Sequence, residues 1–369
     1  MTPRLGISAD YETNPGLHTI DVRAEEHVAA LFNVPLTYDS DGIECAVTPS
    51  GRVSNASGYS SLASNYFHLD AISQFAGNRS SATLQGQLAR DSSLYFIGGL
   101  VNGVGVRRDT EAATGEYTYF MSARSQLQFD ASWSEVRFDQ PAHATILVDY
   151  RYINAGPTFA YQLSERNTLK LIGSYGHYES LNGLSHSNAE SAQLAFVRQL
   201  TELWTLSASG GYSRAANSQT AEVFVPPFFL VPETIKSNQN GTVYAASLTR
   251  QGERFNLSAG ITRALQPTGF AYLLRQDSYT VTTAFVQSVR WDYQLNAALQ
   301  KQQLPQFGGA VGSQRYTYAQ WTVNWHWTSQ WTLSLHAMRL SNRYGSPAVG
   351  PSSTGVRVDV TRQFLRTDL

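Results

Sequence analysis

The chain has 369 residues, a formal net charge of −1 and one cysteine. A nearly neutral chain lacks the basic face that nucleic acid requires, and one cysteine excludes a disulfide framework and a cysteine-rich metal site. Charged residues make up 15% of the chain, against about 25% in soluble domains, and no run of about 18 apolar residues could form a membrane-spanning helix.

The N-terminal part of the chain alternates between apolar and polar residues. Segments 5–11 and 28–36 both show this pattern. A period of two places the apolar side chains on one face of a β-strand and the polar ones on the other. The dipeptide Asp41-Gly42 predicts a hairpin turn after the second segment, and Asn78-Arg79-Ser80 predicts another short turn.

Further along the chain, six turns are each followed by an aromatic residue or leucine and then by strict alternation. These turns lie at 124–125, 164–166, 201–202, 252–253, 290–292 and 329–330. The polar positions carry Gln, Asn, Ser, Thr and Asp over long stretches, which is too polar for a buried core. One face in contact with lipid and the other with water is typical of a transmembrane β-barrel.

The turns recur at intervals that fit two strands, one short turn and one longer loop. Eight short turns with both termini on one side predict about 18 strands, or 16 if one hairpin is miscounted near the N-terminus or in the glycine-rich segment 92–115. Longer connections, rich in turn-forming residues, are expected at 13–25, 93–113, 139–146, 219–239, 264–275, 303–313 and 341–351. The prediction is an all-β, antiparallel up-and-down transmembrane barrel forming a single domain over residues 1–369, with short periplasmic turns and longer extracellular loops.

Aromatic residues fit this arrangement. Four tryptophans stand beside predicted short turns, where an amphipathic ring can occupy the lipid headgroup boundary: Trp204, Trp291, Trp327 and Trp331. Trp133, Tyr175 and Tyr212 lie further along their strands and could form the opposite girdle. The alternative is that tryptophans simply pack inside a β-sandwich, but the polar alternate face disfavours it.

The C-terminal strand resembles the assembly signal of bacterial outer-membrane proteins. That signal combines a polar residue, a glycine, alternating apolar residues and a final aromatic, and the matching positions here are Ser353, Gly355, Val358, Val360 and Phe364. The resemblance implies recognition by the barrel-assembly machinery. The chain departs from the pattern because residues 365–369 follow the aromatic.

Segment 161–169 resembles a sequence motif that recurs in outer-membrane β-barrel porins, including proteins associated with exopolysaccharide export. Segments 198–206 and 327–333 echo it, and the opening 9–15 also resembles the start of such barrels. This resemblance implies the outer membrane of a Gram-negative bacterium, with the signal peptide removed. It also implies outer-membrane lipid and periplasmic components of an export system as partners.

The sequence shows no candidate catalytic, cofactor-binding or metal site. No G-x-S-x-G elbow is present, and a metal site at His326 and His336 would need further ligands, so ordinary polar roles are favoured for both. By strand parity, the candidates for residues lining a water-filled lumen are Asp130, Lys170, Asn256, Gln294, Asn324, His326, His336, Arg357 and Asp359. Their charges are mixed, so strong ion selectivity does not follow.

The leading hypothesis is therefore a non-enzymatic pore that passes solutes or exports polysaccharide. An 18-stranded barrel leaves an aqueous channel unless something fills it, and we expect segment 92–115 or the apolar segment 223–232 as the filler. Two alternatives stay open. One is a plugged structural or partner-binding barrel, and the other is a barrel hydrolase acting on lipid or polysaccharide.

Overall fold

The structure is a computed structural model. It describes the chain except for residues 1, 15–16, 18–21, 23, 56–64, 93–105, 140–146, 226–228, 270–272, 305–311, 346–349 and 365–369. Within the described residues, no helix is long and apolar enough to cross a membrane.

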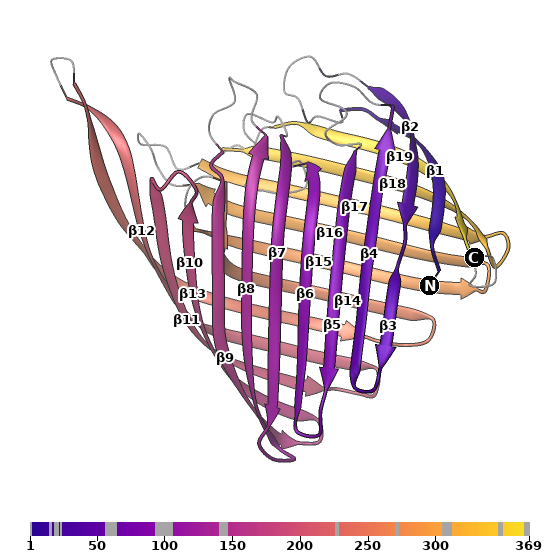
Figure 1. Cartoon of the computed structure of the whole chain (residues 1–369), viewed down its shortest axis with the longest axis horizontal. Coiled ribbons are helices and arrows are strands. Elements are labelled where there is room, and N and C mark those ends of the chain that lie inside the picture. Colours follow the sequence, from indigo (N-terminus) through magenta and orange to yellow (C-terminus); the bar gives the residue numbers. More distant parts are fainter. Residues whose placement is uncertain are drawn as a thin grey trace.

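One antiparallel sheet of 19 strands contains all described strands (Figure 1). The strands are β1 (Arg4–Glu12), β2 (Glu25–Asn33), β3 (Leu36–Ser40), β4 (Ile43–Ser54), β5 (Tyr66–Ala76), β6 (Ser80–Ser92), β7 (Arg107–Phe120), β8 (Ser125–Asp139), β9 (Tyr150–Ser164), β10 (Asn167–Ser180), β11 (Ser185–Gln199), β12 (Trp204–Val225), β13 (Phe229–Arg250), β14 (Phe255–Pro267), β15 (Leu273–Ser288), β16 (Trp291–Leu304), β17 (Gly312–His326), β18 (Trp331–Tyr344) and β19 (Ser352–Gln363). Strands that are neighbours in sequence pair with each other, except that β2 and β3 both pair with β4, and β1 pairs with β19, so the sheet closes into a barrel.

The barrel wall has 18 strands, as predicted. Strands β2 and β3 count as one because they pair with successive parts of β4. The break between them falls at Val34-Pro35, where proline has no N–H to donate to a neighbouring strand. The predicted Asp41-Gly42 turn joins β3 to β4, with Gly42 at a φ of 77°, a conformation that glycine adopts readily.

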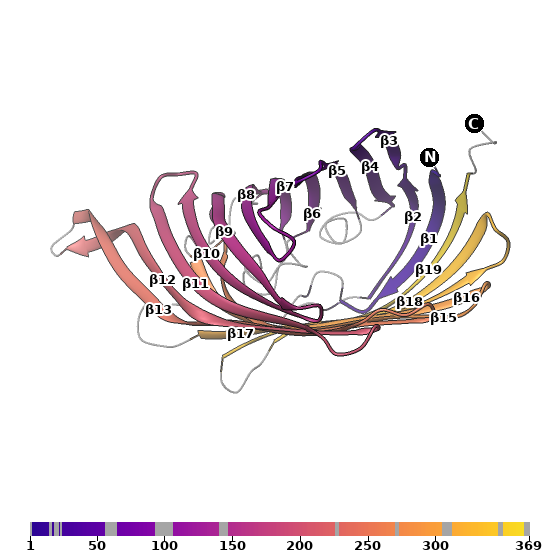
Figure 2. The ribbon, with the colours of Figure 1, turned by 90° about the horizontal axis from the view of Figure 1, so that it is seen from below.

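The two ends of the barrel differ, also as predicted. Eight short connections and both chain termini lie at one end, which we call the lower end; the other is the outer end. Figure 2 shows the wall running from β3 to β8 opposite the wall running from β12 to β18, with the lumen between them.

Some predicted connections at the outer end are wrong. The predicted loop 219–239 is mostly strand, because β12 and β13 stay paired up to Val225 and Phe229 and form a hairpin that projects beyond its neighbours (Figure 1). Proline within this segment does not end the pairing, since the hairpin is free of other strands there and needs fewer backbone partners. Within the predicted connection 93–113, β7 begins at Arg107, and the tight outer turn 181–184 was not predicted.

Exposure on the two faces of the wall is the inverse of that in a water-soluble protein. On β1, the outward Ile7 is 65% exposed, whereas the inward Ser8 is 1% exposed. On most strands outward leucines, valines and aromatics are exposed, and many inward polar residues are buried, among them Ser213, Asn342 and Asp359. The apolar set predicted from the alternation therefore forms the outer surface of the barrel.

Candidate functional site

The lower half of the lumen contains a polar cavity. Its volume is about 640 Å³, and it is lined by residues of β1, β2, β4, β5 and β16 to β19. These strands are neighbours around the closed barrel, because β1 joins β19. Their inward positions bring Arg4, His68 and two aspartate clusters to one cavity.

The first cluster is built on Asp292, at the start of β16. His326 Nε2 lies 2.7 Å from Asp292 Oδ2, and Asn324 Nδ2 donates a hydrogen bond of 2.7 Å to Asp292 Oδ1. The other ring nitrogen of His326 lies 3.1 Å from Thr332 Oγ1. Both carboxylate oxygens and both ring nitrogens thus have partners, so the imidazole is held in one orientation.

The second cluster is built on Asp359 of β19, whose side chain is buried. His336 Nε2 lies 2.9 Å from Asp359 Oδ2, and Arg357 Nε lies 3.2 Å from the same oxygen. His336 Nδ1 lies 3.0 Å from Thr322 Oγ1. One carboxylate here faces an arginine and a histidine, so the cluster mixes both signs of charge within a few ångströms.

The structure brings together most of the predicted lumen residues. Gln294, Asn324, His326, His336 and Asp359 line the lower cavity, and Arg357 contacts Asp359. In the described part of the chain, no three His, Cys, Asp or Glu side chains converge as a metal site would require.

Three predicted lumen residues lie elsewhere on the inner face. Asp130 of β8, Lys170 of β10 and Asn256 of β14 share the inward parity but do not line the lower cavity. Asp130 accepts a hydrogen bond of 2.7 Å from Gln128 Nε2, and Asn256 Oδ1 accepts one of 3.0 Å from the backbone N–H of Gly252. Asn256 therefore braces the short turn before β14.

Sequence reasoning missed several charged lumen residues. It assigned Asp292 to a turn, although that residue shares the parity of Gln294 on the same strand, which would have placed it inward. It also passed over Asp10, which forms a buried ion pair with Arg52 of β4. Arg52 Nε additionally donates a 3.3 Å hydrogen bond to Ser8 Oγ.

Part of the outer half of the lumen is packed with apolar side chains. Apolar and aromatic side chains from the walls and two connections form a buried cluster, which we call the upper core: Val106, Val136, Phe138, Leu147, Tyr150, Tyr178, Ala189, Ala215 and Leu273. The rings of Tyr150 and Tyr178 stack with centroids 5.3 Å apart.

Two connections from separate parts of the wall meet at the upper core. Tyr178 Oη of β10 donates a hydrogen bond of 3.1 Å to the carbonyl oxygen of Thr268, which follows β14. The backbone N–H of Val148, which precedes β9, donates one of 2.7 Å to the carbonyl oxygen of Gly269. These bonds link the β8 to β10 wall to the β14–β15 connection and narrow the lumen between them.

The connection after β1 also packs inward. Leu17 is fully buried against Tyr316 of β17 and Leu340 of β18. The backbone N–H of Asn14 donates to Ser353 Oγ at 3.3 Å, and that of Thr13 donates to the carbonyl oxygen of Thr354 at 3.0 Å.

The described parts of the two segments predicted to fill the lumen lie mostly in wall strands. Residues 223–225 and 229–232 continue the projecting hairpin, and residues 107–115 belong to the wall strand β7. The remainder of both predicted segments lies outside the described residues, apart from Ser92, which ends β6, and Val106, which joins the upper core.

The predicted interface aromatics occupy the lower rim of the outer face. Trp291 and Trp331 are each 39% exposed, and Trp327 is 68% exposed. Trp291 and Trp327 both stack on Trp325, with centroids 5.9 and 6.1 Å apart. Trp204 lies beneath the guanidinium of Arg250 at 6.0 Å.

The predicted assembly signal lies on the strand that closes the barrel. Val358 and Val360 of β19 face outward and are exposed, whereas Ser353 and Gly355 face inward and are buried. The backbone N–H of Phe364 donates a 2.9 Å hydrogen bond to the carbonyl oxygen of Pro3, beside β1. Recognition of this strand by an assembly machinery stays a prediction.

Comparisons with known proteins concern the fold alone. No family model and no curated protein matches the sequence. Among solved structures, OpdK of Pseudomonas aeruginosa, determined with vanillate, is 13% identical, with a TM-score of 0.47 and 98% of each chain covered. The ferric-catecholate import receptor Fiu of E. coli K12 in its open form is 8% identical, with a TM-score of 0.47, 96% of this chain and 81% of Fiu covered. At these values neither similarity carries a ligand or an activity to this chain.

Proposed function

We propose that this protein is an outer-membrane channel that lets hydrophilic solutes pass through its lumen without covalent chemistry. The observation that carries the proposal is the inverted exposure of the two faces, apolar outside and polar inside, on a closed barrel. An apolar outer surface is stable in lipid, and closure leaves no strand edge whose backbone groups would lack partners there.

The dimensions of the wall support this placement. A tilted strand of about 9–11 residues crosses the hydrocarbon layer, and most wall strands here have 12–16 residues. The exposed tryptophans at the lower rim would then lie at one headgroup boundary, with Tyr175 and Tyr212 toward the other. In this orientation the short connections face the periplasm.

The two halves of the lumen would have separate roles. The lower cavity offers a solute hydrogen-bonding groups and charges of both signs, so it would pass polar molecules without strong preference for one sign. The upper core would limit the size of what enters, because it replaces water by packed side chains on part of the cross-section.

Conductance across a planar lipid bilayer tests the proposal. The detergent-folded protein is reconstituted, and current is recorded at several salt concentrations. We expect stable steps that scale with bulk conductivity, as a water-filled pore requires. A folded barrel, verified by its heat-dependent migration in gels, that never conducts would contradict an open channel.

The second candidate is a barrel closed by its own connections until a partner opens it. The observation that favours it is the upper core together with the inward packing of Leu17. Conductance that appears only after the upper core is disrupted would support it. Export of polysaccharide is not supported by the comparisons and stays a prediction from the sequence resemblance, along with any periplasmic partners.

A further inference from the structure

A row of basic residues crosses the outer face of one wall near its outer end. Strand register places Arg263, Asp277, Lys301, Arg315 and Arg343 side by side on β14 to β18. All five share the outward parity of their strands. We call the four cations in this set the basic row.

Positive charge dominates this region. The pocket along the row has a volume of about 530 Å³ and is lined by five basic side chains, those of the row and Arg275, but by one carboxylate, that of Asp277. Arg263 already engages that carboxylate, with Nη2 2.7 Å from Oδ2. Arg315 and Arg343 are exposed, so their guanidinium groups are available to an anion from outside.

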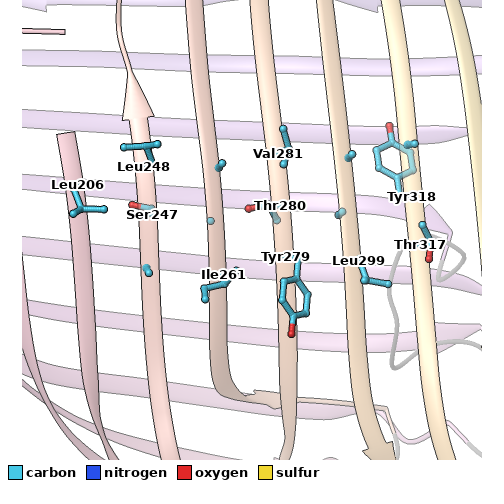
Figure 3. A pocket seen from close by; sticks show the side chains of 16 residues that line it. Leu206, Ser247, Leu248, Ile261, Tyr279, Thr280, Val281, Leu299, Thr317 and Tyr318 are labelled. Carbon is cyan, nitrogen blue, oxygen red and sulfur yellow. The ribbon is translucent and has the colours of Figure 1, made fainter. Parts of the chain in front are cut away.

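A shallow apolar groove lies directly below the basic row on the same face. Its volume is about 590 Å³, and its floor is formed by the small side chains Ala246, Ala259, Ala297 and Ala319. Figure 3 shows Ile261, Tyr279 and Leu299 side by side on neighbouring strands at one end of this groove. Register places these three residues in the row next to the basic one.

Aromatic rings connect the cations to the groove. Lys301 Nζ lies 5.5 Å from the ring centroid of Tyr279, which lines the groove. The guanidinium of Arg263 lies 5.1 Å from the ring of Tyr244. The surface therefore presents cations at the outer end, aromatic rings below them and small apolar side chains below those.

The opposite wall lacks this arrangement at the same height. There, Arg90 lies 3.2 Å from Asp139 and 3.5 Å from Asp109. Arg137 and Arg151 both pair with Glu135, at 2.6 and 2.8 Å. These outward cations are neutralised within the protein. Among the residues that the structure describes, Lys301, Arg315 and Arg343 form no ion pair.

We propose that the β14 to β18 wall binds a phosphorylated lipid of the outer leaflet, that is, lipopolysaccharide. Its phosphates would bind Lys301, Arg315 and Arg343, and an acyl chain would lie in the groove between Ile261 and Ala297. Guanidinium groups bind phosphate through paired, charge-assisted hydrogen bonds. A second copy of this chain fits less well, because a symmetric contact would bring two basic rows together. The inference rests on the outer-membrane placement proposed above, but not on conductance.

Lipid binding to the full barrel in detergent tests the headgroup part. Native mass spectrometry would compare lipid A carrying both phosphates with its dephosphorylated form. We expect the double variant R315S/R343S to lose about tenfold in affinity for the phosphorylated lipid, since charge-assisted bonds contribute this much. The control R90S/R137S removes two cations from the opposite wall and should change affinity by less than about twofold.

A second pair of variants tests the acyl-chain part. A297L/A319L fills the groove from its floor, and the control A131L adds the bulk of one leucine to the opposite wall, where Ala131 also faces outward. We expect only the first to weaken binding. Both replacements face lipid, so the barrel should still fold, as gel migration would verify.

Three results would overturn the inference. They are equal binding of the dephosphorylated lipid, equal losses in R90S/R137S and R315S/R343S, and dissociation of an oligomer by A297L/A319L, which would make the groove a contact between copies. Unchanged binding in A297L/A319L alone would remove the acyl-chain part. Because none of these readouts uses current, they are independent of whether the barrel conducts.

Discussion

The two halves of the lumen lie in one barrel, but side chains from different strands line them and fill them in opposite ways. The lower half keeps a cavity of about 640 Å³ in which Asp292 and Asp359 hold histidines in place. The outer half buries Phe138, Tyr178 and Leu273 in a core of the kind found in soluble proteins. Closure of the wall requires neither arrangement. Under the proposed function, the upper core would limit passage and the lower cavity would present charged groups to the solute.

The largest effect is expected from emptying the upper core. Replacing Tyr178 and Leu273 by alanine removes the stacked ring, the hydrogen bond to Thr268 and a fully buried leucine. We expect the step conductance to rise several-fold, or to appear if the native barrel is closed. Single-channel recording measures this, and L171A, a truncation on the outward face, is the control.

Folding must be verified for this variant, since large-to-small changes in a core cost about 2–5 kcal/mol each. The wall is closed by pairing of all its strands, so the barrel should persist, and its heat-dependent gel migration would show it. An unchanged step size in a folded Y178A/L273A barrel would mean that the upper core does not lie on the permeation path.

A smaller effect is expected from the lower cavity. D292N/D359N keeps the shape of both clusters but removes two negative charges beside His326 and His336. The ratio of cation to anion permeability should fall by up to about fivefold, since one charge contributes about 1 kcal/mol at 4 Å in water. Reversal potentials in a salt gradient measure the ratio.

The control D139N removes a charge from the exposed outer side of β8, where Asp139 pairs with Arg90. It should leave the reversal potential unchanged. If D139N and D292N/D359N shift the potential equally, the selectivity arises outside the lumen and the lower cavity does not set it.

The sequence predicted the strands of the barrel wall well, but it did not predict which side chains fill the lumen. Alternation and turn residues predicted 18 strands, the short connections and the inward parity of residues such as Asn324 and His336, because each depends on neighbours in the chain. The upper core depends on contacts among residues such as Leu147, Tyr150 and Leu273, which are far apart in sequence. The outer part of the β12–β13 hairpin was predicted as a loop because residues 219–239 include three prolines together with Ser, Thr and Asn, which are common in turns.

The smallest effect is expected at Leu17, which lies in the β1–β2 connection and packs into the lumen. Substitutions there separate the contribution of packing from that of backbone strain. Its φ of 50° is left-handed, which costs a non-glycine residue about 1–3 kcal/mol, while its side chain is buried against Tyr316 and Leu340. Leu17→Ala removes the packing and keeps the strain, whereas Leu17→Gly removes both. If packing holds the connection in place, both variants should increase current noise without changing the mean step.

If backbone strain matters as much as packing, the current noise of Leu17→Gly should be lower than that of Leu17→Ala, because glycine adopts this backbone conformation readily. The bonds from Asn14 to Ser353 and from Thr13 to Thr354 remain in both variants, so the connection should loosen at its tip but stay attached to β19. Hydrogen exchange at Thr13 and Asn14 reports that attachment. Rapid exchange there in Leu17→Ala would show that the burial of one leucine, and not the hydrogen bonds, holds this side of the outer lumen together.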